Sequence, residues 1–197
     1  MSKKTTVSHE KTNRKDTVKS LTVTAIFIAL TYVFTAMVNI RLPIAANGGL
    51  IHLGNIPLFI GAILFGKKTG FLAGGIGMGL FDLLSGWTIW APCTFITVGL
   101  MGFVIGLIAE KHRSFRWYTL GIVLACAIKI IGYFIADIII YHSALVALNS
   151  IPGNLIQVGV AAVIVLAVIM RLEVAARKVG LLDENVRQST EGDACIQ

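Results

Sequence analysis

The chain has 197 residues, of which 56% are hydrophobic and only 14% charged, whereas about a quarter of the residues of an ordinary soluble domain are charged. The mean hydropathy of +0.82 and the long apolar runs exclude a water-soluble fold, because a single globular core could not bury those runs. The formal charge of +7 does not indicate nucleic-acid binding, since Lys and Arg lie almost entirely in short segments between or beyond the apolar runs.

Six stretches are apolar enough to cross a bilayer as helices, which takes about 20 mostly apolar residues, or somewhat fewer where neighbours shield the ends. Residues 1–17 precede them and are expected to form a flexible cytoplasmic tail. The second and third stretches are short and rich in glycine, so they predict a tight helical hairpin. A membrane domain at 18–175 is followed by a tail at 176–197. We place the six spans at residues 18–40, 53–65, 69–85, 91–110, 117–141 and 151–171.

The distribution of basic residues sets the orientation. Thirteen of the 17 lie in every second segment between or beyond the spans, and Lys19 and Arg171 lie at the adjoining span ends, which places 15 on one face of the membrane. Because basic loops stay in the cytoplasm, both termini are predicted to be cytoplasmic, and the loops at 41–52, 86–90 and 142–150 are predicted to face outward. The first of these loops is long and glycine-rich enough to act as a lid. The fold predicted from the sequence is therefore an all-α, six-helix membrane bundle.

Polar side chains in and beside these spans are the candidates for function, because such groups are costly in lipid. Apart from Lys129, which lies near mid-depth, they are expected in the outer third of the bilayer. The candidate substrate-binding residues found in this way are Asp82, Trp87, Trp90, Thr94, Lys129, Tyr133, Asp137, Asn154 and Gln157.

The spacing of Lys129, Tyr133 and Asp137 places them on one face of the fifth predicted helix. Eight residues of helix rise about 12 Å, which is too far for a direct ion pair between Lys129 and Asp137. Lys129 is expected either to form a structural salt bridge with Asp82 or to contact a ligand, directly or through water. Both interpretations stay open.

Trp87 and Trp90 flank the loop at 86–90 and also have two interpretations. They belong to the aromatic belt at the membrane surface, or they form a flat platform for a heteroaromatic ring. The chain has no P-loop, no metal-ligand spacing and no catalytic constellation, because its three cysteines are isolated and the glycines at 74–79 follow no strand. We predict no enzyme activity, no cofactor and no metal.

Several strings between residues 48 and 110 carry a family pattern. They are GLIHLGN at 49–55 with PLFIGAILFG at 57–66, GFLAGGIG at 70–77 with DLLSG at 82–86 and WAP at 90–92, and GLMG at 99–102 with GLIAE at 106–110. With these strings the chain resembles the substrate-binding S components of energy-coupling factor (ECF) vitamin transporters, over about residues 20–175. The resemblance adds Asn55 to the candidate substrate-binding residues, at a place where relatives often have an acid.

The resemblance implies a multi-pass protein of the prokaryotic plasma membrane that captures a small vitamin or vitamin precursor from outside. Hydroxymethylpyrimidine or pyridoxine is the best guess for the ligand, ahead of pantothenate and riboflavin. The resemblance also implies that the protein docks on a membrane coupling subunit driven by two ATPase subunits. After docking, the S component topples in the membrane and releases the ligand inward.

Docking in that family uses an Ala-x-x-x-Ala stripe on the first helix, which Ala25 and Ala29 match here. Alanines four residues apart leave a shallow groove for another helix, although the same stripe also suits packing within the bundle. Two other functions remain as alternatives. One is a self-sufficient secondary transporter coupled to protons through Asp82 or Asp137, and the other is a membrane assembly protein that transports nothing.

Overall fold

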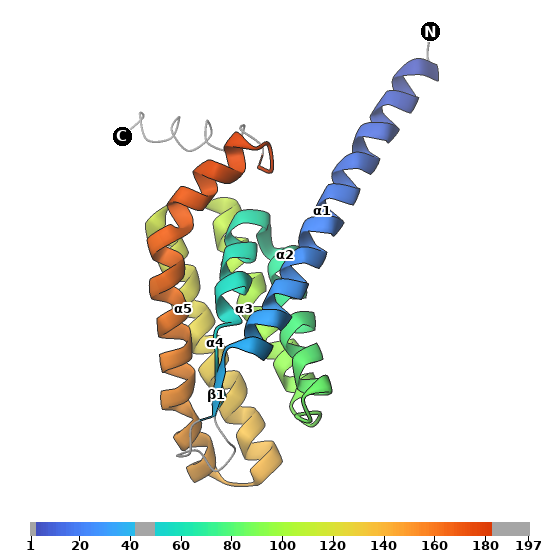
Figure 1. Cartoon of the computed structure of the whole chain (residues 1–197). Coiled ribbons are helices and arrows are strands. Elements are labelled where there is room, and N and C mark those ends of the chain that lie inside the picture. Colours follow the sequence, from blue (N-terminus) through green and yellow to red (C-terminus); the bar gives the residue numbers. More distant parts are fainter. Residues whose placement is uncertain (1–2, 42–49, 183–197) are drawn as a thin grey trace.

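The structure is a computed structural model that describes residues 3–41 and 50–182 of the chain. The described residues form five helices and two short strands, and all five helices are long and apolar enough to cross a membrane (Figure 1). The predicted all-α membrane class is therefore confirmed, with a small β-hairpin in addition. In chain order the elements are α1 (Lys3–Met37), β1 (Asn39–Arg41), β2 (Leu50–His52), α2 (Asn55–Leu84), α3 (Ala91–Lys111), α4 (Phe115–Tyr141) and α5 (Ala144–Lys178).

The count of five in place of six arises because α2 contains both the second and the third predicted spans. At Gly66 the backbone has φ 87° and ψ −176°, a conformation that glycine adopts easily, and the chain turns back there. A Cβ placed on Gly70 would lie 2.7 Å from the Cβ of Ala62, although residues eight apart in a straight helix are about 12 Å apart. The two arms of α2 therefore lie side by side, as the glycine-rich sequence predicts.

The packing of the bundle centres on α2, which contacts α1, α3 and α5, while α4 lies between α3 and α5. Small residues allow the close approach, since a Cβ on Gly74 would lie only 2.6 Å from the carbonyl oxygen of Val98 in α3. The core consists of fully buried apolar side chains such as Phe59, Ile63 and Val165. By contrast, α1 extends away from the other helices at its N-terminal end (Figure 1).

Two of the loops that the sequence predicts to face outward have a structure that differs from the prediction. The ends of the loop at 41–52 pair as the antiparallel strands β1 and β2, and residues 42–49 lie outside the described residues, so a lid stays a prediction. The prediction of a loop at 142–150 is wrong, because α5 already begins at Ala144. There the Ser143 hydroxyl accepts a hydrogen bond from the Val146 N–H. Pro152, a residue typical of a first helical turn, lies inside α5 instead.

Charged side chains connect the helices at the end of the bundle opposite the strands. The buried Glu173 carboxylate accepts hydrogen bonds from the Tyr118 hydroxyl and from Arg177, each over 2.8 Å. Arg113 lies 3.5 Å from the same carboxylate and donates to the carbonyl oxygen of Leu64 over 3.4 Å. These contacts join α2, α4, α5 and the α3–α4 loop, so this end of the bundle is closed.

The turn at Gly66 lies at the same closed end. Glu110 of α3 accepts a hydrogen bond from the backbone N–H of Lys67 over 3.0 Å and forms an ion pair of 3.0 Å with the Lys67 ammonium. One carboxylate thus holds both the backbone and the side chain just after the turn. The hairpin is fixed against α3 as a result.

Candidate functional site

Polar and aromatic side chains gather at the opposite end of the bundle, which carries the β-hairpin. They come from β2, both ends of α2, the start of α3, the second half of α4 and the first half of α5. The loop before α3 contributes as well. We call this group the hairpin-end cluster, and it consists of His52, Asn55, Asp82, Trp90, Thr94, Lys129, Tyr133, Asp137 and Gln157.

Lys129 of α4 is at the centre of the cluster and is only 1% exposed. Its ammonium donates a hydrogen bond to Oε1 of Gln157 in α5 and lies 5.7 Å from the centroid of the Tyr133 ring, within the range of a cation–π contact. Lys129 and Asp82 form no direct ion pair, and the carboxylate interacts with the ammonium only at longer electrostatic range. The structure therefore pairs Lys129 with a neutral amide, and within residues 3–41 and 50–182 no carboxylate forms a salt bridge with this buried group.

The face of α4 predicted from the four-residue spacing does point into the bundle. Asp137 is fully buried, and Tyr133 is partly buried between it and Lys129. The Tyr133 hydroxyl and the Thr94 hydroxyl of α3 share a hydrogen bond of 3.0 Å. The side chains of Thr94 and Asp82 also interact, so α2, α3 and α4 meet at this threonine.

The two tryptophans have different environments. Trp90 is buried, and its ring stacks on Tyr133 with centroids 6.1 Å apart and packs against Tyr141 at 6.0 Å. Trp87 is partly exposed, and its backbone N–H donates to the carbonyl oxygen of Asp82 over 2.9 Å. Trp90, Tyr133 and Tyr141 therefore form an aromatic wall of the cluster.

The two candidate amides of α5 also differ. Gln157 is buried and reaches Lys129, whereas Asn154 is partly buried and donates to the carbonyl oxygen of Ser150 on its own helix over 3.1 Å. The structure thus brings Gln157, and not the amide nitrogen of Asn154, into contact with the rest of the cluster.

Asn55, the first residue of α2, and His52, the last residue of β2, form one side of the cluster. Asn55 is fully buried, and neither Oδ1 nor Nδ2 has a hydrogen-bond partner among the described residues. His52 is also buried, and its Nδ1 accepts a hydrogen bond from the Gly54 N–H over 3.3 Å. Burial first, and the positive charge of Lys129 second, hold the pKa of His52 well below its usual value near 6.5. Sequence reasoning left His52 out, although it lies three residues before Asn55 in the family string.

This environment predicts a stability that depends on pH. Because the pKa of His52 is lowered in the folded state, an unfolded chain binds a proton below about pH 6.5 that the folded protein does not. The contribution of His52 to stability is therefore complete above that pH and is lost as the pH falls below it. The melting temperature of the purified protein should decrease between pH 7.5 and pH 5.5. His52→Asn keeps an acceptor for the Gly54 N–H and cannot be protonated, so its decrease should be smaller; an equal decrease would contradict the assignment.

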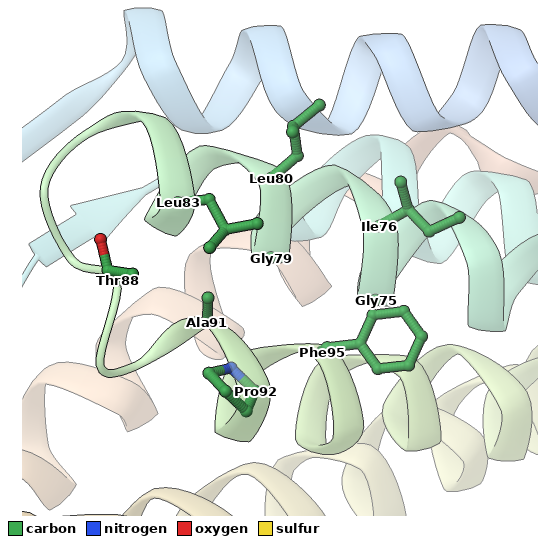
Figure 2. A pocket seen from close by; sticks show the side chains of 9 residues that line it. All are labelled: Gly75, Ile76, Gly79, Leu80, Leu83, Thr88, Ala91, Pro92 and Phe95. Carbon is green, nitrogen blue, oxygen red and sulfur yellow. The ribbon is translucent and has the colours of Figure 1, made fainter.

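An apolar groove of about 460 Å³ lies between the second arm of α2 and the start of α3, and Figure 2 shows the side chains that line it. Ile76, Leu80 and Phe95 form much of its surface, and Thr88 brings the one hydroxyl among the lining residues. A specific small-molecule site usually has several convergent polar groups. The hairpin-end cluster has such groups and the groove does not.

The candidate docking residues lie on the surface of α1. Ala25 and Ala29 are both exposed, whereas Thr24, Thr31 and Thr35 of the same helix are buried. The role of the two alanines stays a prediction.

The chain was compared with known proteins. A family model described as ECF-type riboflavin transporter, S component, matches residues 15–174. An uncharacterised protein of Pyrococcus woesei is 31% identical over 52% of this chain and 68% of its own length. The thiamine precursor transporter HmpT of Lactococcus lactis is 29% identical over 63% of this chain and 70% of its own, and the biotin transporter BioY of Thermotoga maritima is 31% identical over 54% and 74%.

Proposed function

Because the chain belongs to the family of ECF-type riboflavin transporter S components, which are membrane transporters and not enzymes, we propose that its hairpin-end cluster binds a small vitamin or vitamin precursor for import. The observation that carries this proposal is the buried Lys129 ammonium, with Gln157 and the Tyr133 ring beside it and no carboxylate in a salt bridge with it among the described residues. A charge in a membrane helix is costly, and a ligand that accepts hydrogen bonds compensates that cost.

In this proposal the chain crosses the membrane six times, because each arm of α2 crosses once. Lys67 at the hairpin turn and Arg113 after α3 lie at the closed end of the bundle, as do Arg177 and Lys178 at the end of α5. Basic residues mark the cytoplasmic side. Both termini are then cytoplasmic, and the hairpin-end cluster lies toward the outside, at the end of the bundle that carries β1 (Figure 1).

The ligand that we favour is a small heteroaromatic compound, with hydroxymethylpyrimidine or pyridoxine as the best guess. The stacked rings of Trp90 and Tyr133 offer apolar surface, and Lys129 and the amides of Asn55 and Gln157 offer polar contacts. One relative is a thiamine precursor transporter, which agrees with a compound of this size.

The sequence contains no P-loop, so ATP hydrolysis that drives transport would take place in partner subunits. We propose that the exposed Ala25 and Ala29 stripe docks on the membrane coupling subunit that two ATPase subunits drive. Alanines at this spacing let a partner helix approach closely. Their exposure on α1 leaves the stripe free for such a contact.

The function is tested by identifying the small molecule that copurifies with the detergent-extracted protein by mass spectrometry and by measuring its saturable binding. Uptake is then followed in liposomes with and without the ATPase module. We expect a vitamin-like compound, and uptake only when the module and ATP are present. Uptake without the module would indicate a secondary transporter, and the lack of any saturable ligand would indicate an assembly protein.

A further inference from the structure

The Asn55 side chain has a property that packing alone does not explain. It is completely buried, and both its carbonyl oxygen and its amide nitrogen lack a partner within residues 3–41 and 50–182. Buried polar side-chain atoms nearly always have a hydrogen-bond partner, and here one side chain has both a donor and an acceptor unused. A bound molecule that offers the complementary pair would satisfy both.

The position of Asn55 connects it to the ligand site proposed above. It follows β2, which packs against α5, and His52 at the end of β2 interacts electrostatically with Lys129. Side chains pack closely around this turn, because a Cβ on Gly54 would lie 3.0 Å from Cε of Met78 and 3.1 Å from Nδ1 of His52. Asn55 therefore lies in a closely packed turn at the same end of the bundle as Lys129.

A carboxamide presents its oxygen and an N–H side by side. It pairs well with a molecule that has a donor directly next to an acceptor, as when Asn binds the edge of adenine through two hydrogen bonds. We infer that the ligand is a ring compound with such a donor–acceptor edge, as in an aminopyrimidine, a lactam or a cyclic urea, and that Asn55 binds this edge. The inference rests on the proposed function, because it assigns a ligand class to the same site.

Lys129 completes the recognition at a second place on the ligand. Within the part of the chain that the structure describes, its ammonium donates one hydrogen bond, to Gln157, and an ammonium has three donors. The remaining N–H groups suit an oxygen acceptor such as a hydroxyl or a carbonyl. The ligand class therefore combines a donor–acceptor edge for Asn55 with an oxygen substituent for Lys129.

The donor–acceptor edge distinguishes among five candidate ligands: hydroxymethylpyrimidine, riboflavin, biotin, pyridoxine and pantothenate. Hydroxymethylpyrimidine has an amino group next to a ring nitrogen, riboflavin has N–H next to C=O in its pyrimidine ring, and the cyclic urea of biotin has the same pair. The ring nitrogen of pyridoxine has a methyl-bearing carbon on one side and a C–H on the other, so no donor lies next to it, and the open-chain amide of pantothenate has its N–H and C=O on opposite sides. The first three compounds carry the edge, and the last two do not.

The experiment is calorimetric titration of the full-length, ligand-free protein in detergent with these five compounds. We expect the tightest binder to carry the edge, and Asn55→Leu to weaken its binding at least tenfold. The same variant should raise the melting temperature of the ligand-free protein, since it removes two unpaired buried groups and keeps a similar side-chain volume. Asn149→Leu, at an exposed position of α5, is the matched control and should change neither value.

A second readout does not depend on the variant. Wild-type protein should bind hydroxymethylpyrimidine at least tenfold more tightly than the analogue in which a methyl group replaces the amino group, if that compound is the tightest of the five. Tightest binding by pyridoxine or pantothenate would overturn the inference and leave the proposed function intact, as would native affinity in Asn55→Leu. Saturable binding by none of the five, with no small molecule copurified, would overturn both.

Discussion

Replacing Lys129 with Met should weaken ligand binding at least about tenfold, which corresponds to 1.4 kcal/mol, in a protein that remains folded. The ammonium is buried beside Gln157 and Tyr133, so its removal takes away the charged donor at the centre of the cluster. Met keeps much of the side-chain length, and removing the charge leaves no unpaired ion behind. The melting temperature of the ligand-free variant should therefore equal or exceed that of the wild type. Calorimetric titration and thermal unfolding measure the two effects separately.

The control for the loss of a positive charge is Lys111→Met, at an exposed position on α3 close to the closed end of the bundle. It should bind the ligand as the wild type does. Asp82→Asn tests the salt-bridge interpretation, because a direct pair with Lys129 would make this change costly. Since the two groups form no such pair, we expect only a small change in stability. Native ligand affinity in folded Lys129→Met would assign Lys129 a structural role alone.

Replacing Ala29 with Leu should reduce uptake at least about tenfold and prevent copurification with the ATPase module, while ligand affinity stays unchanged. The larger side chain fills the groove that a partner helix needs for close approach. Ala25→Leu should act in the same way, because both alanines are exposed on α1. Uptake assays in liposomes, pull-down with the module and calorimetric titration give the three measurements.

Ala167→Leu offers a matched control, since Ala167 is an exposed alanine on the lipid-exposed surface of α5. It introduces the same added volume at a place that the docking proposal does not use. We expect normal uptake and normal complex formation in this variant. If Ala25→Leu and Ala29→Leu also copurify with the module at the wild-type level, the coupling subunit docks on another surface.

Much of the fold was predictable because lipid imposes simple rules on sequence. Apolar length placed the spans, and the glycines around Gly66 predicted the hairpin that the structure contains within α2. The start of α5 was not predictable in the same way. Pro152 and the polar residues before it are typical of a helix start, but the helix continues through them from Ala144. Local preference was overridden there by a longer helix that packs on α4.

The candidate site was predictable only as far as single helices allow. The four-residue spacing put Lys129, Tyr133 and Asp137 on one buried face. Contacts between helices could not be predicted in this way, because they depend on how the helices of the bundle pack against one another. The hydrogen bond from Lys129 to Gln157 joins residues 28 apart, and nothing in the sequence favoured it over a pair with Asp82. The unused donor and acceptor of Asn55 likewise became visible only in three dimensions.

The charged network around Glu173 restricts the route that a ligand can take. It connects α2, α4, α5 and the α3–α4 loop at the end of the bundle opposite the strands, and opening a passage there would break several hydrogen bonds to a buried carboxylate at once. Under the proposed function, a ligand held at the β-hairpin end would therefore not leave through the Glu173 end. Release into the cytoplasm would then require the β-hairpin end to become accessible from that side, while the helices stay packed.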